Sequence, residues 1–299
     1  MTKQTTPNKA LHFFLTKIII GIAVIVGLVA IVEWLGGLLD KTKLTDDTKH
    51  LIIAISNSAI AISGYVILFR VYEKRQIIEL SASTLVRNAV LGCVSGFLLQ
   101  LLFIIVIYVG GIYSIVRLNQ ISTLLAPLSF ALTGGVVAEI LLIGVLFRLL
   151  EKQTGTIIAL ILFIILFAVL HINVKGATVV SIGATAFQAG LMLPAAYVFS
   201  RSLWLPIFLH FSWDFAEPGI FGGINPSSSL MQGLFTSRIA GDPLLTGGLT
   251  GPQNSLQSLL LCSIAGFVLL LLAKRKNNFI KPTWQSSANN PAAVRWPGR

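Results

Sequence analysis

Long apolar runs alternate with short polar stretches along the whole chain. A helix that crosses a bilayer needs roughly 20 mostly apolar residues, because each backbone polar group must be paired within the segment. Seven runs meet this need, and one more, 203–215, is short. The pattern predicts an all-α, polytopic integral membrane bundle of about eight transmembrane helices, at 11–39, 51–69, 88–109, 121–147, 155–170, 176–200, 203–215 and 256–273.

The composition indicates that lipid is the solvent of this chain. Of its 299 residues, 55% are hydrophobic and only 11% are charged, whereas soluble proteins carry about a quarter charged residues. The net charge of +11 comes from Lys and Arg at the ends of the apolar runs, so we expect membrane lipid as a partner and no nucleic acid. Cys93 and Cys262 lie inside apolar runs, which is typical of core residues rather than of a disulfide or a metal-binding pair.

The basic residues also predict the topology. With the N-terminus inside, fifteen of the 22 Lys and Arg residues fall on the cytoplasmic side and six on the other. Both termini are therefore expected in the cytoplasm, with the protein in the plasma membrane of a bacterial cell. We expect a cytoplasmic segment at 1–10, a single membrane domain at 11–273, and a polar, disordered cytoplasmic tail at 274–299. A Gly-, Ser- and Pro-rich stretch at 216–255 predicts a long outer loop.

Four ionisable residues, Glu139, His171, His210 and Asp214, lie within the predicted helices or at their ends. In lipid each such group needs a partner, a wet cavity or a function. His210 and Asp214 are four positions apart, which places them on one helix face and directs both into the same cavity. Phe167 and His171 share this spacing, so the phenyl ring should pack one turn below the imidazole.

Each of these residues also has a purely structural interpretation. A histidine at a helix end, such as His171, is commonly an interfacial residue bonded to its neighbours. His210 could belong to a polar clasp between helices, and Glu139 could be bonded to a hydroxyl of Ser129 or Thr133 on its own helix. The order of the four residues along the chain is more specific than any one of them.

That order resembles the CPBP family of intramembrane proteases, to which the CAAX-processing enzymes belong. The family pattern is Glu-Glu-x-x-x-Arg, then Phe-x-x-x-His, then His-x-x-x-Asn/Asp. The matching stretches here are the helix at 138–148, Phe167 to His171, and the segment that runs from Ser202 through His210 to Asp214.

The resemblance covers roughly 128–215 and implies a CPBP-like core at about 121–273. It implies that His171 activates water together with the leading glutamate of the first motif. It also implies that His210 and Asp214 polarise the scissile carbonyl or hold the tetrahedral intermediate. Amide hydrolysis needs both an activated nucleophile and a preorganised site for the developing charge.

The first motif departs from the family pattern at two positions. Ala138 stands where the leading glutamate belongs and Ile143 where the arginine belongs, so only the second acid, Glu139, remains. Neighbouring residues on a helix point about 100° apart, so Glu139 cannot take the missing side chain's place without a local change of helix register. Without an arginine at 143, Glu139 is either neutral or free to contact His171.

Three functions follow as hypotheses. The leading one is an intramembrane endopeptidase of the CPBP type that cleaves a membrane-associated protein or peptide, with Glu139, His171, His210 and Asp214 as its catalytic residues. The alternative is a catalytically inactive relative that acts as a membrane binding protein, scaffold or bacteriocin-immunity factor. A proton-coupled transporter is less supported, because neither paired broken helices nor repeat symmetry is visible.

No cofactor is expected. Two histidines and two carboxylates are a legitimate zinc set, and the same four residues would then be the ligands. His171, however, lacks a second ligand at the short helical spacing of His-Glu-x-x-His sites, so we do not favour a metal.

Overall fold

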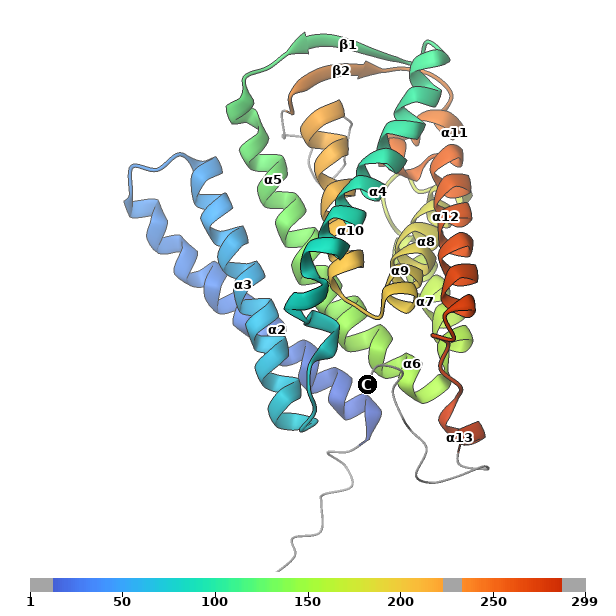
Figure 1. Cartoon of the computed structure of the whole chain (residues 1–299). Helices are drawn as coiled ribbons and strands as arrows, with labels where there is room; N and C mark the ends of the chain where they lie inside the picture. Colours follow the sequence, from blue (N-terminus) through green and yellow to red (C-terminus); the bar gives the residue numbers. More distant parts are fainter. Residues whose placement is uncertain (1–12, 223–232, 287–299) are drawn as a thin grey trace, which may run out of the picture.

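Each apolar run forms a helix, and the helices pack side by side into a bundle (Figure 1). The computed structural model describes residues 13–222 and 233–286. The longer helices are α2 (Phe14–Gly36, continued by η1, Gly37–Lys41), α3 (Asp46–Tyr72), α4 (Ala82–Val109), α5 (Leu125–Leu132), α6 (Arg148–Thr154), α7 (Thr156–His171), α8 (Val179–Phe187), α9 (Leu193–Ser200), α10 (Trp204–Phe215) and α12 (Leu256–Arg275).

Segments of π-helix extend or join several of these helices. They are η4 (Thr133–Ala138), η5 (Ile140–Phe147), η6 (Gln188–Met192) and η7 (Ala216–Phe221). Single 3₁₀ turns lie at η2 (Ile78–Leu80), η3 (Ile121–Leu124), η8 (Gly248–Thr250) and η9 (Pro252–Asn254), and short helices at α11 (Pro243–Thr246) and α13 (Thr283–Ser286).

Six helices within the described residues are long and apolar enough to cross a membrane. They are Phe14–Lys41, Asp46–Tyr72, Ala82–Val109, Ile121–Thr154, Val179–Ser200 and Leu256–Arg275. The predicted all-α, polytopic membrane bundle is thus confirmed, and the chain is an integral membrane protein. The other two predicted spans are present as the shorter α7 and α10, so the total of eight remains a prediction.

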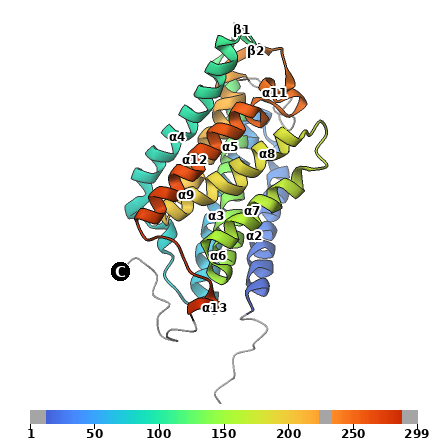
Figure 2. The same ribbon diagram turned by 90° about the vertical axis from the view of Figure 1, so that its right-hand side faces the viewer.

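The helices divide into an outer and an inner set. Only 17% of the most apolar window of Phe14–Lys41 is buried, compared with 56% for Ile121–Thr154 and for Val179–Ser200. Figure 2 shows α12 beside α8 and α9, and α7 beside α8. Glu139 lies on the inner helix Ile121–Thr154, whereas the exposed apolar faces of the outer helices suit contact with lipid.

Two predicted boundaries are wrong. The fourth helix continues to Thr154 instead of ending at 147, because Arg148 and Glu151 are buried, 2% and 0% exposed, in ion pairs rather than exposed at a helix end. The predicted outer loop begins later than 216, because η7 continues α10 to Phe221. Ala216 to Gly219 are buried there, and tertiary packing overrides the loop-forming composition.

The loop regions also contain a small sheet that the apolar pattern does not predict. Strands β1 (Tyr113–Leu118) and β2 (Phe235–Ile239) pair antiparallel, with Tyr113 opposite Ile239 and a register shift between Ile115 and Arg117. The Tyr113 hydroxyl donates a 2.8 Å hydrogen bond to the Phe221 carbonyl. The ribbon thereby ties the end of α4 to the end of η7.

A cluster of charges closes the opposite end of the bundle, which we call the Arg148 cluster: Arg148, Glu73, Arg75 and Glu79. Arg148 Nη1 lies 2.9 Å from Glu73 Oε2, and Arg75 binds both Glu73 and Glu79. Burial alone would raise the pKa of Glu73, but the charge of Arg148 and the hydrogen bond from Arg75 lower it to about 2. Burial and the hydrogen bond from Arg75 likewise act in opposite directions on Glu79, and its pKa is lowered.

Part of the predicted tail is docked on the bundle. The Asn278 amide donates to the Val198 and Phe199 carbonyls, and Ile280 exchanges hydrogen bonds with the backbone and hydroxyl of Thr156. The expectation of a disordered tail is therefore wrong for the stretch up to 286, because this stretch pairs backbone groups that the ends of α9 and α7 leave open. The predicted segment 1–10 and the remainder of the tail, 287–299, lie outside the described residues.

Candidate active site

His210 lies between two carboxylates. Its Nδ1 is 2.8 Å from Glu139 Oε1 and its Nε2 is 3.3 Å from Asp214 Oδ2. Glu139 is 1% exposed, whereas the side chains of His210 and Asp214 keep 18% and 11%. Since carboxylate oxygens accept, both hydrogen bonds form together when the imidazole ring carries two protons.

The path of the fourth helix directs Glu139 towards His210. Glu139 stands between the π-helical segments η4 and η5, and a π turn takes up extra chain relative to an α turn. The residues around Glu139 therefore follow a different register from those of a regular α-helix. Glu139 can take the place of the missing glutamate only with a local change of helix register, and this change is present. Glu139 nevertheless contacts His210 and not His171.

Glycines let α10 approach its neighbours closely. A Cβ on Gly135 would lie 2.7 Å from the backbone of Phe211, and one on Gly134 would lie 2.6 Å from Asp214 Oδ2. On the other side of α10, a Cβ on Gly96 would lie 2.4 Å from the Leu209 carbonyl oxygen. Small residues commonly allow this approach between membrane helices. The position of His210 beside Glu139 thus depends on glycines that let α10 pack closely against the fourth helix on one side and α4 on the other.

His171 ends α7 and has a defined tautomer. Its Nδ1 is 2.8 Å from the Phe167 carbonyl oxygen, and since a carbonyl only accepts, Nδ1 carries the proton. The rings of Phe167 and His171 stack with centroids 6.3 Å apart, as their spacing predicts. Among the described residues Nε2 of His171 has no partner, so its lone pair is free in the neutral ring.

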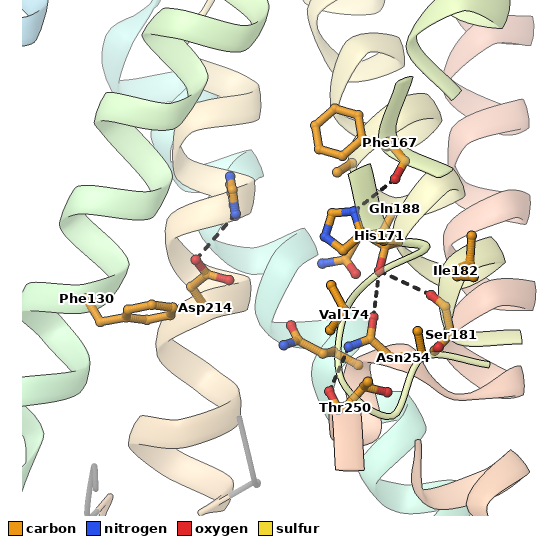
Figure 3. A pocket seen from close by; sticks show the side chains of 15 residues that line it. Phe130, Phe167, His171, Val174, Ser181, Ile182, Gln188, Asp214, Thr250 and Asn254 are labelled. Atoms are coloured by element: carbon orange, nitrogen blue, oxygen red, sulfur yellow. Dashed lines mark hydrogen bonds and ion pairs between the residues drawn. The ribbon is translucent and has the colours of Figure 1, made fainter. Parts of the chain in front are cut away.

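One cavity of about 310 Å³ connects the two histidines. Its lining residues are Phe130, Phe167, His171, Val174, Ala177, Ser181, Ile182, Thr185, Gln188, Ala189, His210, Asp214, Thr250, Gln253 and Asn254. In Figure 3, Phe130 and Asp214 lie on one wall, and His171, Gln188 and Asn254 lie on the other. His171 and His210 therefore reach the same cavity, although they lie on different helices. Glu139 supports His210 from outside the lining.

The comparison with protein families decides what this arrangement belongs to. Residues 119–216 match the family model described as type II CAAX prenyl endopeptidase, Rce1-like. Over these residues the chain is similar to that family, which supports the resemblance to the CPBP proteases. The expected resemblance is confirmed, and the match supports a protein of the CAAX-type intramembrane protease kind. No curated protein and no solved structure matches it significantly.

The two departures from the CPBP pattern lie in well-packed surroundings. Ile143 is 1% exposed and belongs to the apolar core that includes Tyr65 and Leu203. A few residues further on, Arg148 supplies a buried guanidinium that pairs with Glu73 of the loop after α3. The fourth helix therefore carries a buried arginine at 148, but this arginine pairs with Glu73 and not with Glu139.

Several polar residues of the cavity escaped the sequence reasoning. The fourth, fifth and seventh apolar runs contribute Phe130, His171 and His210 to the lining, and α8, η6 and the segment 250–254 also contribute. Gln188 could have been found from the sequence, since an amide inside an apolar run is costly in lipid and therefore indicates a polar surrounding. Gln253 and Asn254 could not have been found in this way, because polar residues are ordinary in a predicted loop.

A second polar group lies behind the cavity. Gln100 of α4, 0% exposed, donates 3.2 Å to Glu217, and Trp213 Nε1 donates 3.2 Å to Gln253 Oε1. These contacts join α4, α10 and the segment 250–254. They hold Gln253 at the wall that faces Asp214.

The side-chain atoms of the site that could bind a metal ion mostly contact one another. Glu139 and Asp214 bind opposite nitrogens of His210. Across 13–222 and 233–286, no group of three or more His, Cys, Asp or Glu side chains is arranged to hold a metal ion. That no metal is needed remains a prediction.

Proposed function

We propose that this protein is an active endopeptidase that hydrolyses a peptide bond of a membrane-associated protein or peptide inside the cavity. The observation that carries the proposal is the pairing of a free His171 Nε2 with a fixed His210 in one cavity. Amide hydrolysis needs a base that takes a proton from water and a hydrogen-bond donor for the developing oxyanion. The free Nε2 of His171 suits the first task, and the fixed ring of His210 suits the second.

In the proposed reaction, His171 Nε2 takes a proton from a water molecule as the oxygen of that water bonds to the scissile carbonyl carbon. Because Nδ1 already donates to Phe167, the ring is held in the tautomer that leaves Nε2 basic. When the tetrahedral intermediate collapses, the C–N bond breaks and the same proton passes from Nε2 to the leaving amine.

His210 serves the oxyanion. Its Nε2 hydrogen lies at the cavity wall, and the 3.3 Å contact with Asp214 is the longer of its two hydrogen bonds. A substrate carbonyl oxygen that enters the cavity can share this hydrogen with Asp214. Glu139 holds the ring at Nδ1, much as a buried carboxylate orients the histidine of a hydrolase triad.

A second candidate function is a CPBP relative without catalysis, acting as a membrane scaffold or immunity protein. Ala138 and Ile143 favour it, since the family's leading glutamate and arginine are both absent and Ile143 is part of the packed core. Under this alternative the cavity still binds a partner, but no bond is broken.

Cleavage by purified protein in nanodiscs distinguishes the two. The substrates are a quenched fluorescent peptide library that includes farnesylated Cys-Val-Ile-Met ends, with and without chelator. We expect cleavage by the natural chain, at least about a hundredfold less with His171→Ala or His210→Ala, and no change with the exposed His50→Ala. Cleavage only after Ala138→Glu with Ile143→Arg would establish the inactive alternative, and loss with chelator would establish a metal.

A further inference from the structure

The polar residues Thr185, Gln188, Gln253 and Asn254 line the cavity on the side of His171. Among them only Gln188 has a side chain that forms no hydrogen bond with a described residue. It is 9% exposed and lines the cavity, but its amide forms no hydrogen bond with a described residue. Its neighbours differ: Thr185 Oγ1 donates 2.8 Å to Asn254 Oδ1, and Asn254 Nδ2 donates 2.7 Å to the Thr250 carbonyl. Because this amide lines the cavity and none of the described residues uses it, it is available to a ligand.

The backbone fixes Gln188 in this position. It begins the π-helical segment η6, and its N–H is shared between the Ala184 and Thr185 carbonyls. Two residues later, a Cβ on Gly190 would lie 2.8 Å from Ile164 Cα, so η6 packs directly on the backbone of α7. The backbone of Gln188 is therefore fixed against α7, the helix that ends at His171, and only the side chain of Gln188 has to be ordered when a ligand binds.

The chemistry of an amide selects its partner. A glutamine offers two donors and one acceptor, whereas a phosphate headgroup needs donors alone and a prenyl chain needs neither. A peptide unit needs both a donor and an acceptor, and in a membrane cavity its polar groups must be paired by protein. Gln253 adds a donor on the same wall, because its Oε1 already accepts from Trp213 while its amide nitrogen has no partner among the described residues.

We propose that Gln188 binds the main chain of an extended peptide segment next to the bond presented to His171. Its amide N–H donates to a substrate carbonyl, and its amide oxygen accepts from the N–H of a substrate residue. The inference rests on the proposed function only in taking a peptide as the occupant of the cavity. It names the recognised group as the backbone, so sequence selectivity has to come from other parts of the cavity.

The test measures binding separately from cleavage. The probe is a fluorescein-labelled apolar dodecapeptide, together with analogues in which one backbone nitrogen at a time is methylated. Anisotropy is recorded on mixing, before turnover, with the natural protein and with Gln188→Leu in nanodiscs. Gln257→Leu is the control, since Gln257 is also buried, 7% exposed, but lies outside the cavity lining.

We expect Gln188→Leu to weaken binding about tenfold, which corresponds to the loss of one or two net hydrogen bonds. Methylation at one position should weaken binding to the natural protein by a similar factor and have no effect with Gln188→Leu, as in a double-mutant cycle. The thermal unfolding midpoint should stay the same or rise, because an unpaired polar group has been removed.

Equal affinity of the two proteins overturns the inference, and so does a lowered unfolding midpoint that accompanies lost binding, or absence of binding to the natural protein. Binding that depends on Gln188 without any cleavage overturns the proposed function alone. Cleavage that is unchanged by Gln188→Leu overturns this inference alone.

Discussion

Oε1 of Glu139 lies 2.8 Å from Nδ1 of His210, which joins two helices across 71 positions of sequence. The other oxygen of Glu139 is buried without a partner among the described residues, so this one hydrogen bond is the carboxylate's main anchor. A buried carboxylate held in this way fixes the orientation of the imidazole ring more than it adds to stability.

Glu139→Gln should lower cleavage by about a hundredfold while the protein still folds. The amide oxygen can still accept from Nδ1 of His210, but the negative charge that favours a doubly protonated ring is gone. The measurement is initial cleavage rate together with the thermal unfolding midpoint in the same detergent. Glu33→Gln is the control, because Glu33 lies on α2 and pairs with Asn57 far from the cavity. Equal rates for natural protein and Glu139→Gln would contradict a role for this carboxylate.

Gly135→Ala should reduce both stability and activity, although it adds only a methyl group. The new Cβ would lie 2.7 Å from the Phe211 backbone, so α10 must move away from the fourth helix. We expect a loss of about 1 to 3 kcal/mol, typical of overpacking, measured by unfolding in detergent. Gly27→Ala is the matched control: nothing lies within 4 Å of its Cβ, and that variant should be neutral or slightly more stable.

Arg148→Met should be among the most destabilising single changes in the chain. Arg148 is 2% exposed, donates 2.9 Å to Glu73 and lies 4.6 Å from the centroid of the Phe69 ring. Removal of one partner from a buried ion pair costs about 3 to 5 kcal/mol, because the other charge is left without it. A double-mutant cycle with Glu73→Gln should show coupling: the double variant should lose less than the two single losses together. Additive losses would show that the pair is not coupled.

The stability of the protein should depend on acid through Glu73. Its pKa of about 2, compared with an ordinary value of 4.5, means that the folded state favours the ionised carboxylate. This contribution is fully present above about pH 4.5, and it is lost as the pH falls towards 2. Its size is at most about 3 kcal/mol. Unfolding midpoints measured from pH 7 down to pH 3 should fall less steeply for Glu73→Gln, with part of the slope remaining from Glu79, whose pKa is also lowered. Identical profiles would exclude Glu73 as the source.

Much of the fold could be predicted from the apolar runs alone. Every predicted span is present as a helix because the requirement to pair backbone groups in lipid leaves few alternatives. Likewise, the spacing of His210 and Asp214 predicts their contact, since residues four apart on a helix always meet.

What the sequence could not predict depends on long-range geometry. The contact between Glu139 and His210 requires the π-helical register around 133–147, which results from packing against α10 and leaves no local signature. The β1–β2 ribbon pairs segments on either side of the six helices α5 to α10, and its strands are short and weakly patterned. The burial of Arg148 also runs against expectation, because a basic residue near a helix end normally marks the membrane surface.

The Arg148 cluster ties the fourth helix to residues that precede it in the chain. Glu73, Arg75 and Glu79 leave the ribosome before the helix that carries Arg148, and they stand outside the segment 119–216 that matches the family. The guanidinium of Arg148 therefore depends for its pairing on a carboxylate outside that segment. The segment 119–216 is consequently not self-sufficient: excised at residue 119, it would bring the charge of Arg148 into lipid and leave behind the carboxylates that make its burial tolerable.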